Sequence, residues 1–122
     1  MNVVEYKQMV SKKGSGYKAL GRLKSGQMNK TEQKYAMLLE HEKASGKVLW
    51  YEFEPMNLRL ADKCFYKVDF LVLTDNFELQ VHEVKGFWTD DALVKIKAAA
   101  EKFPFQFYSF QLKNNEWIRR EF

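Results

Sequence analysis

Two segments rich in β-branched and aromatic residues, 65–73 and 77–85, are separated in this chain only by Thr74, Asp75 and Asn76. Such segments are typical of β-strands, and a short polar connection between two strands indicates a hairpin. Because the connection is so short, the two strands must be antiparallel neighbours. The sequence therefore predicts a β-hairpin near the middle of the chain.

Helical patterns lie on both sides of this hairpin. We expect a first helix at about 30–45, with Asn29 or Thr31 as its N-cap, and a second helix at about 90–102, capped by Thr89. The order of elements is then α-β-β-β-α-β, with one more strand at the end. A strand that follows the second helix can return as a parallel neighbour through a right-handed crossover. The expected fold class is α/β, a mixed sheet flanked by helices. The remaining strands are expected at 48–54, 105–112 and 117–122, with a short extension at 57–60.

The basic residues are concentrated at the N-terminus. Residues 1–30 contain seven Lys or Arg and one acid, whereas residues 31–122 contain thirteen basic and fifteen acidic residues. We expect residues 1–28 to be a basic arm or linker and residues 29–122 to be one domain. This asymmetry favours a polyanionic partner, although a solubilising tail has the same composition. The single Cys64 and the lack of a signal peptide or a membrane-spanning segment predict an intracellular protein without a membrane partner.

Three charged residues lie on the predicted hairpin: Asp69 on its first strand, and Glu83 and Lys85 on its second. Side chains alternate along a strand, so Glu83 and Lys85 share a face. A two-residue loop would put Asp69 and Glu83 on opposite faces. The three-residue loop 74–76 puts them on the same face, as diagonal neighbours about 7–8 Å apart at Cα. A site that uses both acids requires such an odd-numbered loop or a bulge, and Asn76 suits the left-handed conformation that the loop needs at its last position.

Two acids and a lysine on one face suggest a metal site. Mg²⁺ is a hard cation that one or two carboxylates, waters and substrate phosphate oxygens can satisfy, and it can activate a water for attack on a phosphodiester. An ammonium group beside it, here Lys85, can orient the water or stabilise the developing charge. A hairpin salt bridge from Lys85 or Lys67 to Asp69 is the structural alternative. Glu32, in the first turn of the first helix, is a third acid that could face the sheet, but Asn29-x-x-Glu32 also resembles a capping box.

At these residues the chain resembles the PD-(D/E)xK nuclease superfamily. Asp69 matches the first motif acid, residues 83–85 match the (D/E)xK element, and the element order matches the restriction-endonuclease-like core. Val68 stands where many members have proline. From about residue 29 to residue 112 the chain is similar to small phage-encoded proteins of that superfamily. Their similar segments are Asn29-Lys30-Thr31-Glu32, Phe53-Glu54-Pro55, Tyr66-Lys67-Val68-Asp69-Phe70 and His82-Glu83-Val84-Lys85-Gly86-Phe87-Trp88.

The resemblance implies a Mg²⁺- or Mn²⁺-dependent DNA endonuclease in the cytoplasm of a phage host. It implies that Asp69, Glu83 and Glu32 bind the metal and that Lys85 completes the catalytic set. Relatives include Holliday-junction resolvases, so cleavage selective for branched or nicked DNA is expected, and a homodimer would suit two-strand cleavage. The alternative is a catalytically inactive DNA-binding module of a phage recombination or packaging complex. RNA as the substrate is a third alternative.

Several further residues are candidates for DNA binding or for the core. Phe87 and Trp88 could stack on an unpaired base or wedge a junction, but we favour core packing for both. His82 should point away from the face of Glu83 and be packed or hydrogen-bonded rather than catalytic. The expected contacts to the DNA backbone are Lys12, Lys13, Lys18, Arg22 and Lys24 of the arm, and Lys95 of the second helix.

Overall fold

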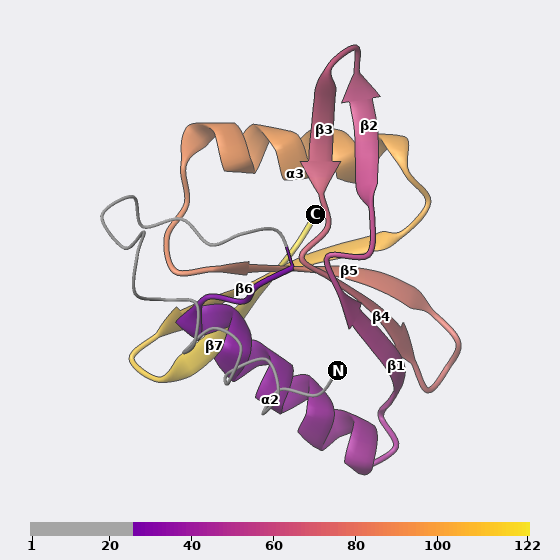
Figure 1. Ribbon diagram of the computed structural model, residues 1–122, viewed down its shortest axis with the longest axis vertical. Coiled ribbons are helices and arrows are strands. Elements are labelled where there is room, and N and C mark those ends of the chain that lie inside the picture. The colour runs from indigo at the N-terminus through magenta and orange to yellow at the C-terminus, as the bar shows by residue number, and fades with distance from the viewer. Residues whose placement is uncertain (1–25) are drawn as a thin grey trace.

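The structure, a computed structural model, describes residues 26–122 (Figure 1). The predicted arm residues Lys12, Lys13, Lys18, Arg22 and Lys24 lie outside the described residues. In chain order, the elements of the described part are α2 (Lys30–Ala44), β1 (Val48–Phe53), β2 (Asn57–Ala61), β3 (Cys64–Lys67), β4 (Phe70–Thr74), β5 (Leu79–Lys85), α3 (Asp90–Lys102), β6 (Gln106–Lys113) and β7 (Glu116–Glu121).

Within residues 26–122, five strands form one mixed sheet in the order β1-β4-β5-β6-β7, and β2 and β3 form a separate two-stranded hairpin. Neighbouring strands of the sheet are antiparallel except β5 and β6, which are parallel. Helix α3 connects these two strands, as expected for a β-α-β crossover. The predicted α/β class, with a mixed sheet flanked by helices, is confirmed.

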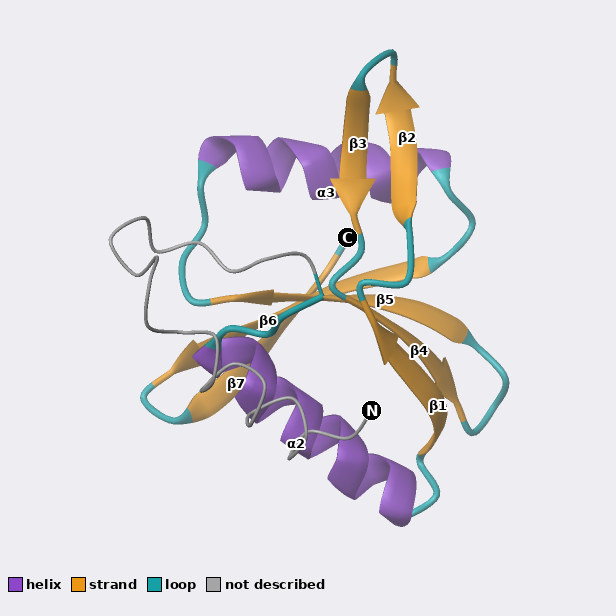
Figure 2. Ribbon diagram, viewed as in Figure 1, coloured by secondary structure: helices purple, strands orange, loops and turns teal. Residues whose placement is uncertain are grey.

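One helix lies on each side of the sheet (Figure 2), and each face of the sheet carries a hydrophobic core. Tyr35 and Leu39 of α2 are buried against one face, where they pack with Phe70. Ile96 of α3 is buried against the other face with Phe107, and the β2–β3 hairpin extends this second core. Neither of the described helices is long and apolar enough to cross a membrane.

Helix α2 begins where the sequence predicted. The Asn29 side chain accepts a hydrogen bond of 2.8 Å from the Glu32 backbone N–H, and Glu32 Oε1 accepts one of 2.9 Å from the Asn29 N–H. These reciprocal bonds satisfy two N–H groups that have no partner inside the helix. After the helix, Gly46 takes φ of +87°, a conformation that costs glycine little. The capping-box interpretation of Glu32 is therefore confirmed.

The predicted single strand 65–73 was wrong. It is divided at Val68 and Asp69, so that β3 pairs with β2 in the hairpin and β4 belongs to the sheet. Val68 is fully buried, and its N–H donates to the Met56 carbonyl at 3.2 Å. The chain thus leaves one sheet and enters the other within two residues, which places Asp69 in a bend rather than inside a strand.

The loop between β4 and β5 has the predicted odd length but not the predicted position. Leu73 pairs with Leu79, and a hydrogen bond of 3.0 Å from Thr74 N–H to the Glu78 carbonyl continues this register. The tip is therefore 75–77 rather than 74–76. Phe77, not Asn76, takes the left-handed conformation, with φ of 63°. The predicted and observed registers differ by two residues on β5, so both put the same side chains on each face of the sheet.

Candidate functional site

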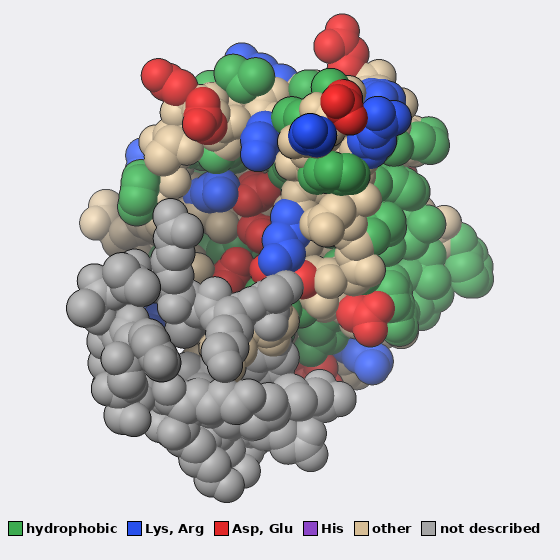
Figure 3. Space-filling view, turned by 45° about the horizontal axis from the view of Figure 1, so that its top comes forward, with side chains coloured by type: hydrophobic (Ala, Val, Ile, Leu, Met, Phe, Trp, Pro, Cys, Tyr) green, Lys and Arg blue, Asp and Glu red, His purple; other side chains and the backbone are tan. Residues whose placement is uncertain are grey.

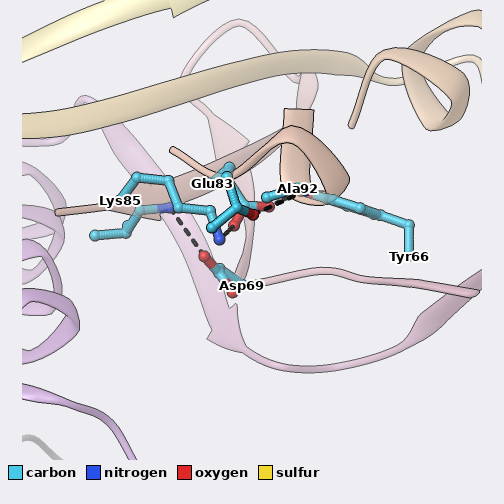
Figure 4. A network of polar contacts seen from close by, with 7 residues as sticks. Tyr66, Asp69, Glu83, Lys85 and Ala92 are labelled. Carbon is cyan, nitrogen blue, oxygen red and sulfur yellow. Dashed lines mark hydrogen bonds and ion pairs between the residues drawn. The ribbon is translucent and has the colours of Figure 1, made fainter. Parts of the chain in front are cut away.

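Asp69 is fixed by its backbone and by its side chain. Its carbonyl accepts a hydrogen bond of 2.7 Å from the Glu54 N–H, and its carboxylate Oδ2 accepts one of 2.9 Å from the Val84 N–H (Figure 4). Phe70 pairs with His82, so continuing this register by one residue puts Asp69 opposite Glu83. The two acids are direct rather than diagonal neighbours, because the loop tip is displaced by one residue. They lie on the same face of the sheet, as a shared site requires.

Glu83 is a buried acid with a partner on each carboxylate oxygen. It is only 5% exposed. The Tyr66 hydroxyl donates a short hydrogen bond to Oε1, and Lys85 Nζ lies 3.0 Å from Oε2 (Figure 4). The structural alternative to a metal site was a salt bridge from Lys85 or Lys67 to Asp69, but the observed salt bridges of these two lysines are to other acids. Lys85 pairs with Glu83, and Lys67 Nζ lies 3.5 Å from Glu54 Oε1.

The charged groups of this site change one another's pKa values. Burial, followed by the charge of Glu83 and a hydrogen bond with it, raises the pKa of Asp69 well above its ordinary value, and the charge of Glu32 adds to this shift. Burial acts to lower the pKa of Lys85, but the charges of Glu83, Asp69 and Glu32 outweigh it, so the pKa is raised. Lys85 therefore keeps its proton at neutral pH. The raised pKa values of Asp69 and Glu32 mean that negative charge on these acids is unfavourable without a further cation, and a bound cation would relieve this.

Glu32 caps helix α2, and its charge also raises the pKa values of Asp69 and Lys85. The residue is 9% exposed. Burial is the main reason that its pKa is raised, and the charges of Glu54 and Glu83 raise it further. One oxygen is committed to the Asn29 N–H. The structural role of Glu32 is thus established, and its role as a metal ligand stays a prediction.

Glu54 is a fourth acid that the sequence did not single out. It follows β1 with φ of 48°, a conformation uncommon for a residue with a side chain. Its Oε1 accepts a hydrogen bond of 2.7 Å from the Gly26 N–H, and its charge raises the pKa of Glu32. The sequence signal that could have indicated Glu54 is Pro55, because a proline is expected to end the strand and Glu54 lies directly before it. A turn of the chain, rather than a strand or helix pattern, brings Glu54 to the other acids.

The surface of this region is compatible with a cation and a polyanion. Acidic side chains gather in a hollow at the centre of one face, with Lys and Arg side chains on either side (Figure 3). No group of three or more His, Cys, Asp or Glu side chains in residues 26–122 is arranged to hold a metal ion. Mg²⁺ usually takes only one or two carboxylates and completes its shell with waters and substrate phosphates. Asp69 and Glu83 supply such a pair, so the donor set fits Mg²⁺ or Mn²⁺.

The other predicted residues lie outside this site. Lys95 is exposed on α3. His82 is 5% exposed and faces α2, where the Tyr35 hydroxyl lies 2.6 Å from Nδ1 and Gln80 Oε1 lies 2.8 Å from Nε2. Burial, with a smaller effect of Arg119, lowers the pKa of His82 to about 3. The prediction that His82 is packed and hydrogen-bonded is confirmed.

Comparison of the chain with models of protein families, with curated proteins and with solved structures found no match. The structure establishes an α/β fold with a mixed sheet. Any assignment of activity therefore depends on the residues of the site and their geometry.

Proposed function

We propose that this chain is a metal-dependent DNA endonuclease of the PD-(D/E)xK type, encoded by a phage and selective for branched or interrupted DNA. The observation that carries the proposal is that the buried side chains of Asp69 and Glu83 interact directly, with Lys85 Nζ 3.0 Å from the Glu83 carboxylate. Two acids and one amine that lie close together can bind a metal ion and stabilise the charge that develops when a phosphodiester is hydrolysed. These three residues are also the ones that match the PD-(D/E)xK motif in the sequence.

The residues of the site have separate tasks in this proposal. Asp69 and Glu83, with Glu32 in support, would hold Mg²⁺ or Mn²⁺, which lowers the pKa of a water and neutralises charge on the phosphate. Tyr66 and Lys85 orient the Glu83 carboxylate from its two sides. Lys85 stays protonated, and its ammonium stabilises the charge that develops on the phosphate oxygens.

The fold supports the same proposal. Elements α2, β1, β4, β5, α3 and β6 follow the α-β-β-β-α-β order of the superfamily core, and the β2–β3 hairpin is inserted between β1 and β4. The insertion covers the α3 side of the sheet and supplies Tyr66 to the site. Affinity for DNA would come from the basic residues of segment 1–28 and from Lys95, and it would fall as the salt concentration rises. A homodimer remains a further prediction.

A panel of DNA substrates tests the proposal. The full chain is incubated with continuous duplex, nicked duplex, four-way junction, single-stranded DNA and RNA, each with Mg²⁺, Mn²⁺, Ca²⁺ or EDTA. Cleavage of branched or nicked DNA with Mg²⁺ or Mn²⁺, and none with EDTA, is the expected result. Cleavage that EDTA does not stop, or no cleavage of any substrate, would refute it.

A DNA-binding module without turnover is the second candidate. One observation favours it: both oxygens of Glu83 already have protein partners. Tight, salt-dependent binding of DNA with no product in the presence of any of the metal ions would support this second function.

A further inference from the structure

Phe87 is an aromatic residue whose side chain is exposed to solvent. It is 75% exposed, in the loop 86–89 between β5 and α3. Core packing was the prediction for both Phe87 and Trp88. Trp88 is half-buried and packs against the core on the α3 side, so the prediction is confirmed for Trp88 and wrong for Phe87.

The loop is anchored on both sides of Phe87. Before it, the Gly86 carbonyl accepts a hydrogen bond of 3.1 Å from Gln111 Nε2 of β6. After it, the Trp88 ring lies 5.9 Å from the Phe122 ring between centroids, and Thr89 Oγ1 accepts a hydrogen bond from the Ala92 N–H. Because both neighbours are held, the exposure of Phe87 is a property of the folded loop.

Phe87 also follows the site closely in the chain. It is two residues beyond Lys85, so their Cα atoms are at most about 7 Å apart. Lys85 Nζ lies 3.0 Å from Glu83 Oε2 and 5.9 Å from the centroid of the Trp88 ring. Successive phosphates of one DNA strand are about 3.4 Å apart along the helix axis, so the nucleotides next to a bound phosphate fall within this range. An aromatic ring at this place can reach the base of a nucleotide whose phosphate lies at the acids.

We propose that Phe87 stacks on an unpaired or unstacked base next to the phosphate that is cut. The inference rests on the proposed function and narrows its substrate class. In a continuous duplex the neighbouring bases cover both faces of each base, so an added ring has no face to contact. At a gap, flap or junction one face is open, and stacking of an aromatic side chain on it is worth about 1–3 kcal/mol per base. Phe87 would thus favour interrupted DNA over continuous duplex.

Phe77 provides a matched control. It is the same residue type, is 78% exposed, and lies in the loop that precedes β5. The seven residues of β5 separate the two loops, a distance of roughly 20 Å. Replacing either phenylalanine with alanine removes one exposed ring, but only Phe87 lies at the end of β5 that carries Glu83 and Lys85.

The experiment compares wild type, Phe87→Ala, Phe87→Trp and Phe77→Ala on a gapped duplex and on the same duplex without the gap. With Mg²⁺, Phe87→Ala should lower kcat/KM on gapped DNA about 10-fold or more. Its effect on continuous duplex should be less than about 2-fold. Phe87→Trp should restore the wild-type rate, and Phe77→Ala should keep it. In EDTA, 2-aminopurine at the gap should be quenched by wild type and not by Phe87→Ala.

The two readouts separate the inference from the proposed function. If wild type cleaves gapped DNA and Phe87→Ala cleaves it equally well, the endonuclease stands and the inference is wrong. An equal loss on both substrates would also overturn the inference, because it indicates general binding rather than stacking. If wild type cleaves nothing, the endonuclease proposal fails, and the 2-aminopurine signal alone decides the inference: quenching that depends on Phe87 supports it, and any other result overturns it.

Discussion

The Asp69 side chain, just before β4, interacts with the Glu83 side chain of β5, although thirteen residues lie between them in the chain. The Asp69 carboxylate bonds to the N–H of Val84, the residue after Glu83. Burial and the charge of Glu83 raise the pKa of Asp69. A pair of acids that repel each other in the folded protein lowers its stability, and such a pair is expected where a cation binds.

Replacing Asp69 with asparagine should stabilise the fold and abolish cleavage. The pKa of Asp69 is raised above its ordinary value of 3.8, first by burial and then by Glu83. At pH values above 3.8, ionisation of Asp69 is therefore less favourable in the folded protein than in the unfolded chain, which lowers the stability of the fold. The amide has no charge and still offers an oxygen to the Val84 N–H. Urea unfolding at pH 8 should show a gain on the order of 1 kcal/mol. The gain should vanish as the pH falls toward 4, where the wild-type acid is also protonated. A variant that is less stable than wild type at pH 8 would contradict this electrostatic account.

Two substitutions of Lys85 should distinguish the effect of its positive charge on stability from the role of its ammonium group in catalysis. Lys85→Met leaves buried Glu83 without its cation, and we expect a loss of about 1–2 kcal/mol after allowance for the partial exposure of the lysine. Lys85→Arg keeps the charge and should recover most of the stability. Both variants should lose at least about 100-fold in kcat, because the planar guanidinium cannot take the position of the ammonium. Exposed Lys95→Met is the control for stability and should be near wild type. Full activity of Lys85→Arg would exclude a positional role of the ammonium.

The Tyr66 hydroxyl should affect metal binding through Glu83. The ring is 4% exposed, and its hydroxyl donates to Glu83 Oε1. Tyr66→Phe removes only this donor, so we expect a loss of stability of about 1–3 kcal/mol. The Mg²⁺ concentration that gives half the maximal rate should rise about 10-fold or more, as for other residues that orient a metal ligand. An unchanged Mg²⁺ dependence would show that the hydrogen bond does not position Glu83 for the metal.

His82 should make the folded protein less stable in acid. Gln80 Oε1 can only accept, so Nε2 carries the proton and Nδ1 accepts from the Tyr35 hydroxyl. Burial lowers the pKa of His82 to about 3 from the ordinary 6.5. Below pH 6.5 the unfolded chain therefore gains a proton that the folded one lacks. Relative to His82→Gln, wild type should lose up to about 1.4 kcal/mol per pH unit between about pH 6 and pH 4.

Comparison with His82→Gln is needed because Asp69 and Glu32 act in the opposite sense. Their raised pKa values make the folded protein more stable as the pH falls, so the wild-type curve alone mixes both effects. A difference between wild type and variant that does not change with pH would show that His82 is not held neutral by the fold.

Much of the fold follows from local signals in the sequence. The capping box at Asn29, the Thr89 cap and the crossover through α3 were predicted from residue type and spacing, because they depend on neighbours close in the chain. The division of segment 65–73 was not predicted. Its β-branched and aromatic residues favour strand throughout, and only the tertiary position of Val68 in the core separates β3 from β4.

The candidate site was predictable only in part. The shared face of Asp69 and Glu83 needs only an odd loop length, so it held even though the loop tip moved by one residue. Glu54 was missed, and Phe87 was wrongly expected in the core, for the same physical reason. One is placed by a turn with positive φ and the other by an anchored loop, and neither conformation leaves a periodic pattern in the sequence.

Cleavage of four-way-junction DNA by wild type, Glu83→Gln and Glu101→Gln tests the central claim most directly. Glu101 is an exposed acid on α3, so its substitution controls for the loss of one negative charge. With Mg²⁺, wild type and Glu101→Gln should cleave at rates within about 2-fold of each other, and Glu83→Gln should be at least about 100-fold slower. Cleavage by Glu83→Gln at the wild-type rate would contradict the account.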